Sequence, residues 1–420
     1  MSSAAEFKWG EIVLLDDLVS SGEVQLGRGN VISKIDIRNN PGQYPIYSSS
    51  SKNDGKMGEY GSFMFDEELI SWSVDGGGYF FHRPKHKFSV TNVSGYMRLS
   101  PSWDYRFTAY SLQFQHEYFS FDYQTKAHPS VIREFYLFPK VPHPEQKKIA
   151  AILSSVDRVI EKTRAQIDKL KDLKTGMMQE LLTKGVGPGG ISHTEFKTSP
   201  LGKIPAVWKI ATVESLLSNV PNPMRSGPFG SALLKKELVT DGIPFLGIDN
   251  VHVEYFRQSF KRFITEDKFK ELKRYEVFPG DVMVTIMGTV GRCCVVPDGV
   301  GKAISSKHVW TITLDKDKYV PELLCWQINY ANWVKQQFKN ESQGGVMDSI
   351  SSGTLKNLVI PVPPIEEQRK IVKVYRGLTS SIEKKESKLC SIQSLKKSLM
   401  QDLLTGKVRV SVEARDLADA

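Results

Sequence analysis

The chain has 420 residues, of which 40% are hydrophobic and 25% are charged, and its formal charge is +9. This length allows two or three domains, the composition excludes a disordered or fibrous protein, and the positive charge favours a polyanionic partner. Because the chain shows no apolar run of roughly 18 residues, no signal-peptide pattern and no metal-type cysteine spacing, we expect a cytoplasmic protein that binds neither a membrane nor a metal.

A globular head is predicted over residues 1–141, followed by a long helix over 142–185. Apolar residues in the helix recur at steps of three and four, which places them on one face. Pro142 and Pro144 lie at its start and Gly185 at its end, where these residue types are common. The members of this apolar stripe are Ile149, Ile152, Val156, Ile160, Ile167, Leu170, Leu173, Met177 and Leu181.

A connector and a second head are predicted next. Residues 186–205 are rich in Gly, Pro, Ser and Thr, which predicts a flexible connector. Residues 206–362 contain short β-type runs (MVTIM, CVVP and VWTITL) broken by Gly-Asp and Pro-Asp-Gly turns, together with some helical stretches. We therefore expect a second head of mixed α/β structure.

The segment 363–408 repeats the first long helix. The sequence from Pro361 aligns without a gap to the sequence from Pro139, and about a third of the aligned positions are identical. A weaker echo pairs Trp9 with Trp208 ahead of the two helices. The chain is therefore predicted to consist of two units of similar layout. The second stripe contains Ile371, Val374, Leu378, Ile382, Leu389, Ile392, Leu395, Leu399 and Leu403.

The two stripes are predicted to pack on each other as an antiparallel coiled coil, because neither helix can bury its own stripe. A partner protein that covers the stripes is the alternative. The fold class is thus α+β, with two mixed α/β heads held apart by the helix pair, approximate two-fold symmetry and a tail over 409–420. Thr163 and Lys385 interrupt the stripes at equivalent positions, where they could fix the register or leave a solvated gap.

The sequence lacks the motifs of the catalytic classes that we considered. An amino-methyltransferase needs an Asp/Asn/Ser-Pro-Pro-aromatic motif, but the one Pro-Pro pair, at 363–364, lies between Val362 and Ile365. Gly301 and Lys302 lack the upstream glycine of a phosphate-binding loop, and the histidines form no metal-ligand pattern. We therefore interpret the chain as a binding protein without a catalytic residue.

Two heads, each followed by a long helix that a Pro-rich Glu-Gln segment introduces, resemble the layout of the specificity subunits of type I restriction–modification systems. Several phrases also resemble that family: LGKIPAVW before the second head, RSGPFGSALLKKELVTDGIPFL and FPGDVMVTIMGTVGR inside it, and NLVIPVPPIEEQRKIV at its end. The resemblance covers nearly the whole chain, although the first head carries poorer versions of these phrases. Their order and duplication make the resemblance specific.

The resemblance implies that the chain is the non-catalytic DNA-recognition subunit of a larger complex. Each head would be a target recognition domain that reads one half of a split, asymmetric site in double-stranded DNA. The helices would set the spacing between the halves and dock two modification subunits, and restriction subunits would join the same complex. S-adenosylmethionine, ATP and Mg would be bound by these partner subunits, and this chain would bind no cofactor.

Candidate DNA contacts are the basic and amide side chains of the heads, which suit phosphates and base edges. For any one of them, a solvated surface charge is the more frequent outcome. The candidates in the first head are Lys52, Asn53, Lys56, Arg83, Lys85, His86, Lys87, Lys126 and His128. Those in the second head are Arg225, Lys235, Lys236, Arg257, Lys261, Arg262, Arg274, Arg292, Lys307 and His308.

Two other functions compete with DNA recognition. A coiled-coil scaffold whose heads bind protein would need the same duplicated helices. Sequence-selective and salt-sensitive binding of duplex DNA would distinguish the two, because binding to phosphates weakens steeply with salt. A single-chain enzyme with unfamiliar motifs is the third possibility, and it would require catalysis by the isolated chain.

Overall fold

The computed structural model describes residues 7–50, 52–75, 79–119, 121, 126–341 and 349–412. The chain divides into two compact units: unit 1 spans Met1–Gln166 together with Lys385–Ala420, and unit 2 spans Ile167–Lys384. Both units contain helices and strands, as the sequence predicts. Residues 413–420 of the expected tail lie outside the described part of the chain.

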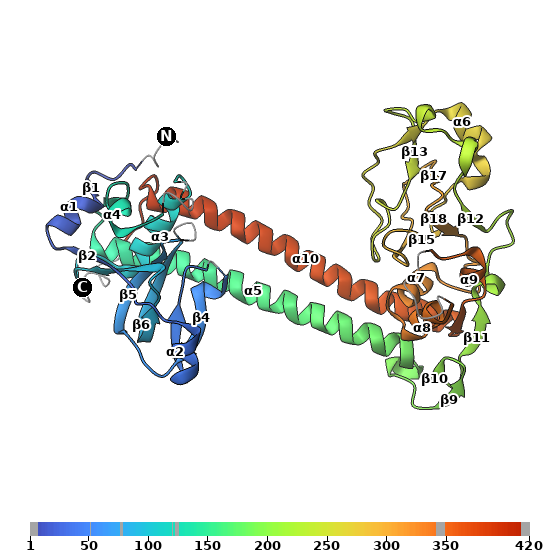
Figure 1. Cartoon of the computed structure of the whole chain (residues 1–420), viewed down its shortest axis with the longest axis horizontal. Helices are drawn as coiled ribbons and strands as arrows, with labels where there is room; N and C mark the ends of the chain where they lie inside the picture. The colour runs from blue at the N-terminus through green and yellow to red at the C-terminus, as the bar shows by residue number, and fades with distance from the viewer. Residues whose placement is uncertain are drawn as a thin grey trace. The chain divides into compact units, whose positions relative to one another are not determined.

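Both segments with an apolar stripe form continuous helices (Figure 1). Helix α5 spans His143–Lys184 and helix α10 spans Ile365–Leu404. Each helix has glutamate in its first turn, where a negative charge stabilises the positive end of the helix dipole. Gly185 and Gly406 follow the two helices with φ values of 63° and 77°, a backbone conformation that glycine adopts without strain. Each unit contains one half of each helix.

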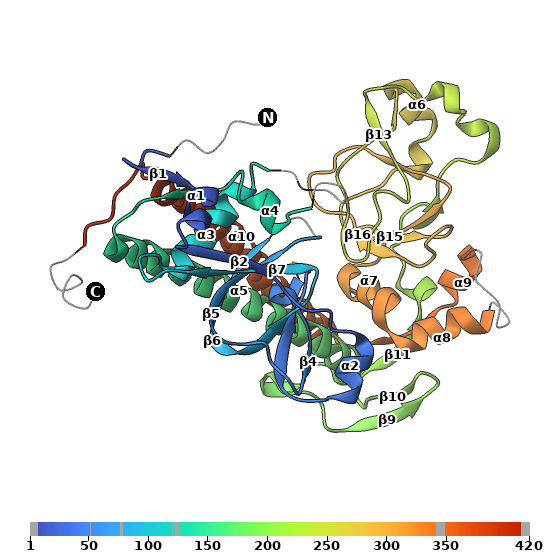
Figure 2. The ribbon, with the colours of Figure 1, turned by 60° about the vertical axis from the view of Figure 1, so that its left-hand side comes forward.

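The head of unit 1 is built on a six-stranded sheet with the strand order β2-β7-β5-β6-β3-β4 (Figure 2). Strand β3 runs parallel to β6, whereas the other neighbours are antiparallel. Helix α3 packs against β5 and β6, and β1 pairs with β8. The elements are β1 (Ile12–Leu14), α1 (Leu15–Ser20), β2 (Val24–Arg28), α2 (Lys34–Asn39), β3 (Tyr44–Tyr47), the 3-10 turn η1 (Lys52–Gly55), β4 (Lys56–Tyr60), β5 (Phe65–Ser73), β6 (Phe80–Val90), β7 (Ser94–Leu99), α3 (Tyr105–His116), α4 (Pro129–Ile132) and β8 (Leu137–Pro139).

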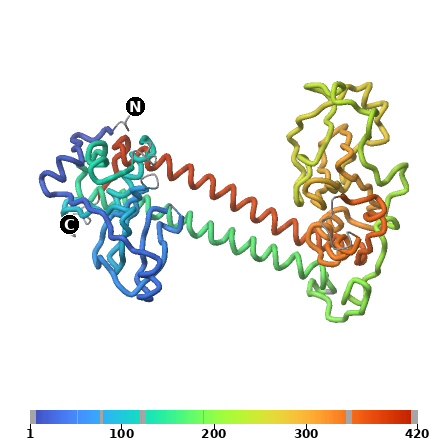
Figure 3. Tube along the Cα trace, in the orientation of Figure 1, coloured from blue at the N-terminus to red at the C-terminus, as the bar shows by residue number. Residues whose placement is uncertain are grey.

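Apolar clusters hold unit 1 together. One fills the head around Trp72, between the sheet and its helices. Another joins the head to the long helices, and Ile149 of α5 and Leu404 of α10 are fully buried in it beside Trp9. The indole Nε1 of Trp9 donates a hydrogen bond to the carbonyl of Leu404 at 2.8 Å. The beginning of the described chain therefore meets the end of α10 (Figure 3).

The head of unit 2 has smaller sheets, of which the largest are β12-β18-β15-β16 and β14-β13-β17. Strands β13 and β17 are parallel, and β11 pairs with β19. The elements are η2 (Pro188–Gly190), β9 (Phe196–Ser199), β10 (Gly202–Pro205), β11 (Lys209–Thr212), η3 (Val213–Leu216), β12 (Met224–Ser226), η4 (Gly230–Ala232), η5 (Lys235–Glu237), β13 (Ile243–Leu246), β14 (Phe263–Ile264), α6 (Glu266–Glu271), η6 (Lys273–Tyr275), β15 (Val282–Thr285), β16 (Cys293–Val295), β17 (Ile304–Ser305), β18 (Val309–Ile312), α7 (Pro321–Tyr330), α8 (Asn332–Glu341), α9 (Ser352–Lys356) and β19 (Val359–Val362).

The core of unit 2 also includes both long helices. Leu181 of α5 and Ile371 of α10 lie in one apolar cluster with Trp208, which is 1% exposed. In unit 1 the start of α5 meets the end of α10, and in unit 2 the end of α5 meets the start of α10. Part of each stripe is therefore buried against the other helix and against the adjoining head.

The segment 186–205, which the sequence predicts to be a flexible connector, contains regular structure. Strands β9 and β10 form an antiparallel hairpin within it. The backbone N–H of Val186 donates to Oε1 of Glu367 at 3.0 Å, and Nε2 of His193 lies 3.0 Å from the same oxygen. The prediction was wrong because the Gly and Pro residues form turns of a folded segment that is tied to the start of α10.

The first turn of each long helix contains a buried glutamine that makes the same contacts with its head. Gln146 and Gln368 are 1% and 0% exposed. The side-chain amide of each donates to the carbonyl five residues earlier at 2.8 Å and to a head carbonyl, at 3.2 Å for Gln146 and 3.1 Å for Gln368. Each Oε1 accepts the backbone N–H of the residue that precedes α3 or α7. The glutamine of the repeated Glu-Gln pair thus joins the first turn of each helix to its head.

The glutamate before each glutamine joins the start of one helix to the chain at the end of the other. Glu145 accepts hydrogen bonds from the guanidinium of Arg409 at 2.5 Å and from the backbone N–H of Val410 at 3.3 Å. Glu367 accepts one from Nε1 of Trp208 at 3.1 Å. These two residues are 3% and 7% exposed. Each unit therefore buries a carboxylate together with the hydrogen-bond donors that it needs.

The residues of the two predicted stripes are buried to different degrees. Two stripe residues at equivalent positions, Leu173 and Leu395, are 50% and 53% exposed, and Val374 is 38% exposed, so the prediction that the stripes are buried was wrong at these three positions. The buried stripe residues are Ile149, Ile160, Ile167, Leu181, Ile371, Ile382 and Leu403. The half-buried ones are Ile152, Val156, Leu170, Met177, Leu378, Leu389, Ile392 and Leu399.

The two polar residues that interrupt the stripes both have partners within unit 1. Thr163 is 6% exposed, and its hydroxyl donates to the carbonyl of Val159 at 2.7 Å. Nζ of Lys385 donates to Oε1 of Gln166 on α5, also at 2.7 Å. Neither position is therefore an empty gap, and Lys385 makes a polar link from α10 to α5.

Candidate nucleic-acid interface

Several basic candidates of unit 2 meet at one edge of the three-stranded sheet. Because β13 and β17 are parallel, the residues that follow them leave the sheet at the same edge, and these include Lys307 and His308. Arg262 directly precedes β14, the antiparallel neighbour of β13, and so reaches that edge too. Lys235 comes from the turn η5. The topology thus gathers positive charge from three separate segments.

These four basic side chains line a pocket of about 220 Å³, which we call the basic pocket. Leucines of the 233–238 segment and Phe245 supply its apolar wall. Two glycines allow the walls to approach: a Cβ on Gly247 would overlap the guanidinium of Arg262, and a Cβ on Gly227 would overlap the backbone carbonyl of Ser305, the last residue of β17. An apolar wall with a positively charged rim suits a nucleotide, which combines a base with a phosphate.

Arg262 is held in place by neighbouring groups. Its Nη2 forms an ion pair with Asp249, and its guanidinium lies 5.9 Å from the ring centroid of Phe245. The side chain is 34% exposed. An arginine fixed in this way can present its remaining N–H groups in one direction, which is the requirement for bidentate recognition of guanine or phosphate.

His308 is affected by the same cluster. Partial burial, and then the charges of Lys307 and Arg262, lower the pKa of its imidazole. The ring is therefore neutral near neutral pH, and it can both donate and accept a hydrogen bond. Such a group suits a base edge, whereas Lys307 and Lys235 suit phosphate oxygens.

Arg225, another candidate, lies inside the head and not on its surface. It is 7% exposed and forms an ion pair with Asp281 at 2.5 Å. Its other N–H groups donate to the carbonyl of Glu276 at 2.6 Å and to the hydroxyl of Thr313 at 2.8 Å. Its donors are used within the protein, so we remove Arg225 from the candidate contacts.

The remaining candidates of unit 2 are scattered over the head, and none of them lines the basic pocket. Arg292 is half-buried, and the guanidinium of Arg274 lies 4.8 Å from the ring centroid of Tyr275. The exposed ones are Lys236, Arg257, Lys261 and Arg274.

Arg83 of unit 1, like Arg225 of unit 2, is buried inside its head. It is 4% exposed, lies 3.6 Å from the ring centroid of Tyr47, and donates to Oγ of Ser71 at 2.8 Å and to the carbonyl of Asp54 at 2.6 Å. Burial lowers its pKa to about 10. Arg83 therefore supports the turn η1, and we remove it from the candidate contacts as well.

A wide hollow of about 1350 Å³ in unit 1 lies between strand β6, helix α3 and the long helices. Of the predicted candidates, Asn53, Lys56, Arg83 and His86 line it. Five further cations that were not predicted also line it, because charged residues on a helix have the sequence pattern of an ordinary solvated face. These are Arg106, Arg158, Arg164, Lys396 and Lys397.

The other candidates of unit 1 lie outside this hollow. Lys52 and Lys85 are exposed. The ammonium of Lys87 lies 4.8 Å from the ring centroid of an aromatic neighbour, and Lys126 forms an ion pair at 3.0 Å. His128 is half-buried at the start of α4. These candidates therefore do not contribute to the hollow.

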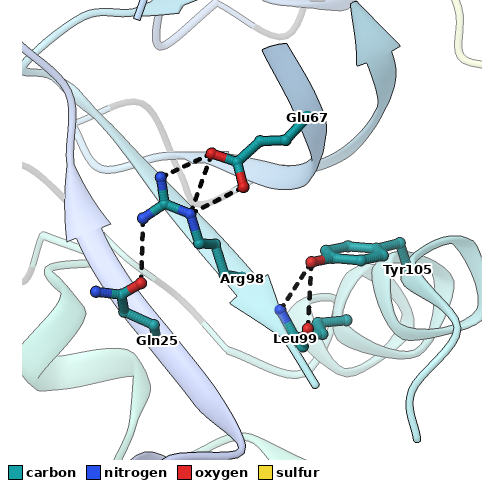
Figure 4. A network of polar contacts seen from close by, with 5 residues as sticks. All are labelled: Gln25, Glu67, Arg98, Leu99 and Tyr105. Carbon is teal, nitrogen blue, oxygen red and sulfur yellow. Dashed lines mark hydrogen bonds and ion pairs between the residues drawn. The ribbon is translucent and has the colours of Figure 1, made fainter. Parts of the chain in front are cut away.

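One arginine of the unit 1 sheet was not among the candidates and is also occupied within the protein. Arg98 on β7 binds the carboxylate of Glu67 on β5 at 2.8 Å and the side chain of Gln25 on β2 at 3.1 Å (Figure 4). The adjacent Leu99 donates its backbone N–H to the hydroxyl of Tyr105 at 3.0 Å. This network joins three neighbouring strands to α3 and stabilises the sheet.

Two classes of site are absent from the described part of the chain. None of its helices is both long and apolar enough to cross a membrane. Among the same residues, no group of three or more His, Cys, Asp or Glu side chains could hold a metal ion.

Both halves of the chain match one known protein family. The family described as type I restriction modification DNA specificity domain matches residues 11–172 and 230–390. The MjaVIII specificity subunit of Methanocaldococcus jannaschii is 26% identical over 88% of this chain and 87% of its own length. The EcoBI specificity subunit of Escherichia coli is 25% identical over 67% of this chain and 60% of its own length.

A solved structure shows a similar fold. The crystal structure of the type I restriction–modification S subunit from M. genitalium has a TM-score of 0.58 and 16% sequence identity, and the match covers 96% of this chain and 98% of that chain.

Proposed function

Because this chain belongs to the family of type I restriction–modification specificity subunits, we propose that it recognises a bipartite, asymmetric sequence in double-stranded DNA, with one head on each half. The observation that carries the proposal is the duplicated layout, in which each head is fixed to the start of a long helix by the same buried glutamine. The two heads differ in their sheets, which supports two different half-sites.

The long helices are proposed to pair as an antiparallel coiled coil with approximate two-fold symmetry, and so to set the spacing between the half-sites. The contacts within each unit support this pairing, since the start of each helix meets the end of the other. The matched roles of Glu145 and Glu367 support the symmetry. A two-fold arrangement would let two copies of one modification subunit approach opposite strands of the DNA.

The modification subunits are proposed to dock on the part of each stripe that remains accessible. Leu170, Leu173 and Met177 on α5 are half-buried or exposed, and the residues at the equivalent positions of α10 are too. Such a strip, present twice, suits two copies of one apolar partner surface. S-adenosylmethionine on these subunits, and ATP and Mg on restriction subunits, would supply the chemistry in the cytoplasm, where the DNA lies.

The proposed function is tested by reconstitution. Purified with its modification subunits and S-adenosylmethionine, the chain should direct adenine methylation to one split sequence in a random-sequence DNA library. Exchanging residues 210–360 for those of a relative should change one half-site and leave the other unchanged. Methylation without sequence preference would contradict DNA recognition and would favour a protein-binding scaffold.

The basic pocket gives a second, local prediction. Replacing Lys307 by alanine should weaken DNA binding equally for all sequences and reduce the slope of log affinity against log salt by about 1, because one phosphate contact is lost. Replacing Arg262 by alanine should cost about 1–3 kcal/mol and relax specificity at one position of one half-site. Both effects are measured by fluorescence anisotropy with duplexes that carry the mapped site.

Lys236→Ala serves as the matched control, because this lysine is exposed next to the pocket and does not line it. Equal losses for Lys236→Ala and Lys307→Ala would show that the pocket has no special role. If Arg262→Ala leaves every position of the site equally selective, Arg262 does not read a base.

A further inference from the structure

A carboxylate in unit 1 joins the head to both long helices at one point. Asp157 on α5 accepts a hydrogen bond from the hydroxyl of Tyr110 on α3 at 2.6 Å. Its other oxygen lies 2.7 Å from Nζ of Lys396 on α10, and this ammonium lies 5.3 Å from the ring centroid of Tyr110. Burial, and then the hydrogen bond to Asp157, raises the pKa of Tyr110, so the phenol keeps its proton and remains a donor.

Unit 2 contains a group of the same chemistry. Glu254, in the turn closed by the Val251–Phe256 bridge of the head, accepts a hydrogen bond from the hydroxyl of Tyr375 on α10 at 2.5 Å. Its other oxygen lies 3.0 Å from Nζ of Lys174 on α5, and this ammonium lies 4.8 Å from the ring centroid of Tyr375. One carboxylate again joins three elements.

The backbone at Glu254 is held in an unusual conformation. Its φ is 61°, in the left-handed region that a non-glycine residue seldom adopts, and its N–H donates to the carbonyl of Cys293 at 3.0 Å. The side chains of Glu254 and Lys174 are 17% and 24% exposed. A charge-assisted contact that is mostly removed from water is stronger than a surface ion pair. The strained backbone at Glu254 is of the kind that persists where the surrounding structure requires it.

The two groups are not copies of one ancestral set of residues. Lys174 and Lys396 occupy equivalent positions in the repeat, but the tyrosine and the carboxylate have exchanged elements. The position of Asp157 is taken in the second helix by Thr379, whose buried hydroxyl has no hydrogen-bond partner in the described part of the chain. The same three-way contact is therefore built from different positions, which indicates a shared requirement for it.

We propose that these two carboxylate–tyrosine–lysine groups are positioning contacts that set the angle at which each head leaves its helices, and that they thereby determine which spacer lengths between the half-sites are accepted. This inference rests on the proposed function. Asp157 lies 11 residues after Gln146 on α5, and Tyr375 lies 7 residues after Gln368 on α10. Each head is therefore held at a second point along the helix that the glutamine joins to it, and two points define its orientation.

The experiment uses the full chain assembled with its modification subunits and S-adenosylmethionine. Duplexes carry the two half-sites, mapped first with the wild-type complex, separated by spacers that differ by single base pairs. Glu254→Gln and Tyr375→Phe should keep both half-site sequences and reduce the preference for the best spacer over its neighbours on the order of tenfold, because a hydrogen bond to a charged group is lost. Asp157→Asn should do the same from unit 1.

Two comparisons separate positioning from stability. Lys174→Arg keeps the charge and donors and should retain the wild-type spacer profile. Glu214→Gln removes an exposed carboxylate that pairs with Lys356 within the unit 2 head, away from the helices, and should leave the profile unchanged. Thermal unfolding of each variant confirms that it is folded.

An unchanged spacer profile in folded Glu254→Gln and Tyr375→Phe would overturn the inference. An equal loss of methylation at every spacer would also overturn it, because that is the result of simple destabilisation. A wild-type complex that methylates no split site would overturn the proposed function first, and the inference with it.

Discussion

Replacing Arg225 by methionine is expected to lower the free energy of unfolding of the protein by about 3–5 kcal/mol, because it leaves the carboxylate of Asp281 buried without its cation. The two side chains are 6% and 1% exposed. Asp281 would keep only the hydroxyl of Thr313 at 2.6 Å and the backbone N–H of Phe278 at 2.8 Å. The loss is measured by denaturant unfolding followed by tryptophan fluorescence.

The pH dependence of this loss is a sharper test than its size. Burial raises the pKa of Asp281 in the folded protein, although Arg225 acts to lower it. In the variant the pKa should rise further, because only the raising effect of burial remains in full. A raised folded pKa means that the carboxyl stabilises the fold below its unfolded pKa and loses this contribution as pH rises through the folded pKa. The difference in stability should therefore shrink at acidic pH.

Arg257→Met is the matched control for this prediction, since Arg257 is an exposed arginine of the same head. It should change the stability by no more than about 0.5 kcal/mol. A loss for Arg225→Met that is small, or that grows as pH falls, would show that the buried ion pair does not have the assigned role. A DNA contact at Arg225 would instead leave stability unchanged and reduce affinity.

Replacing both Leu173 and Leu395 by glutamate is expected to abolish assembly with the modification subunits while the chain stays folded. Both leucines are about half exposed, so their replacement should cost little stability. A charge in the middle of an apolar contact, in contrast, remains without a partner when the surface is covered, and we expect affinity to fall at least about a hundredfold. Each single variant should bind one modification subunit in place of two.

The stoichiometry is measured by analytical ultracentrifugation of the reconstituted complexes. Ile191→Glu provides the control, because Ile191 is 72% exposed and lies outside the long helices. Full binding of two subunits by the double variant would exclude these strips as the docking surface. A single variant that loses both subunits would show that the two sites are not independent.

The sequence by itself determined the two long helices and their repetition. An apolar stripe depends only on the spacing of residues along one segment, so it predicts a helix without knowledge of its neighbours. The alignment of Gln146 with Gln368 and of Trp9 with Trp208 likewise predicts equivalent roles, and both pairs lie at the junction of head and helix. Family membership followed from the same repeated segments.

The tertiary structure decided which charges are available. The local sequence around Arg83 and Arg225 predicts surface charges. An arginine has the same local sequence pattern whether or not the fold brings a partner near it. Their partners come from other elements: Asp281 for Arg225, and Ser71 on the neighbouring strand β5 for Arg83. The basic pocket has the same origin, since the pairing of β13 with both β14 and β17 brings Arg262 and Lys307 together.

The burial of the stripes also depends on the tertiary structure. Periodicity places Leu173 on the apolar face of α5 together with Ile167, but the first is half exposed and the second is buried. Spacing along a helix identifies a face, whereas burial depends on what that face meets, and this changes along the helix as heads and helix partners change. Local pattern therefore determined the elements of this protein, and only long-range packing decided which of their side chains remain free to bind.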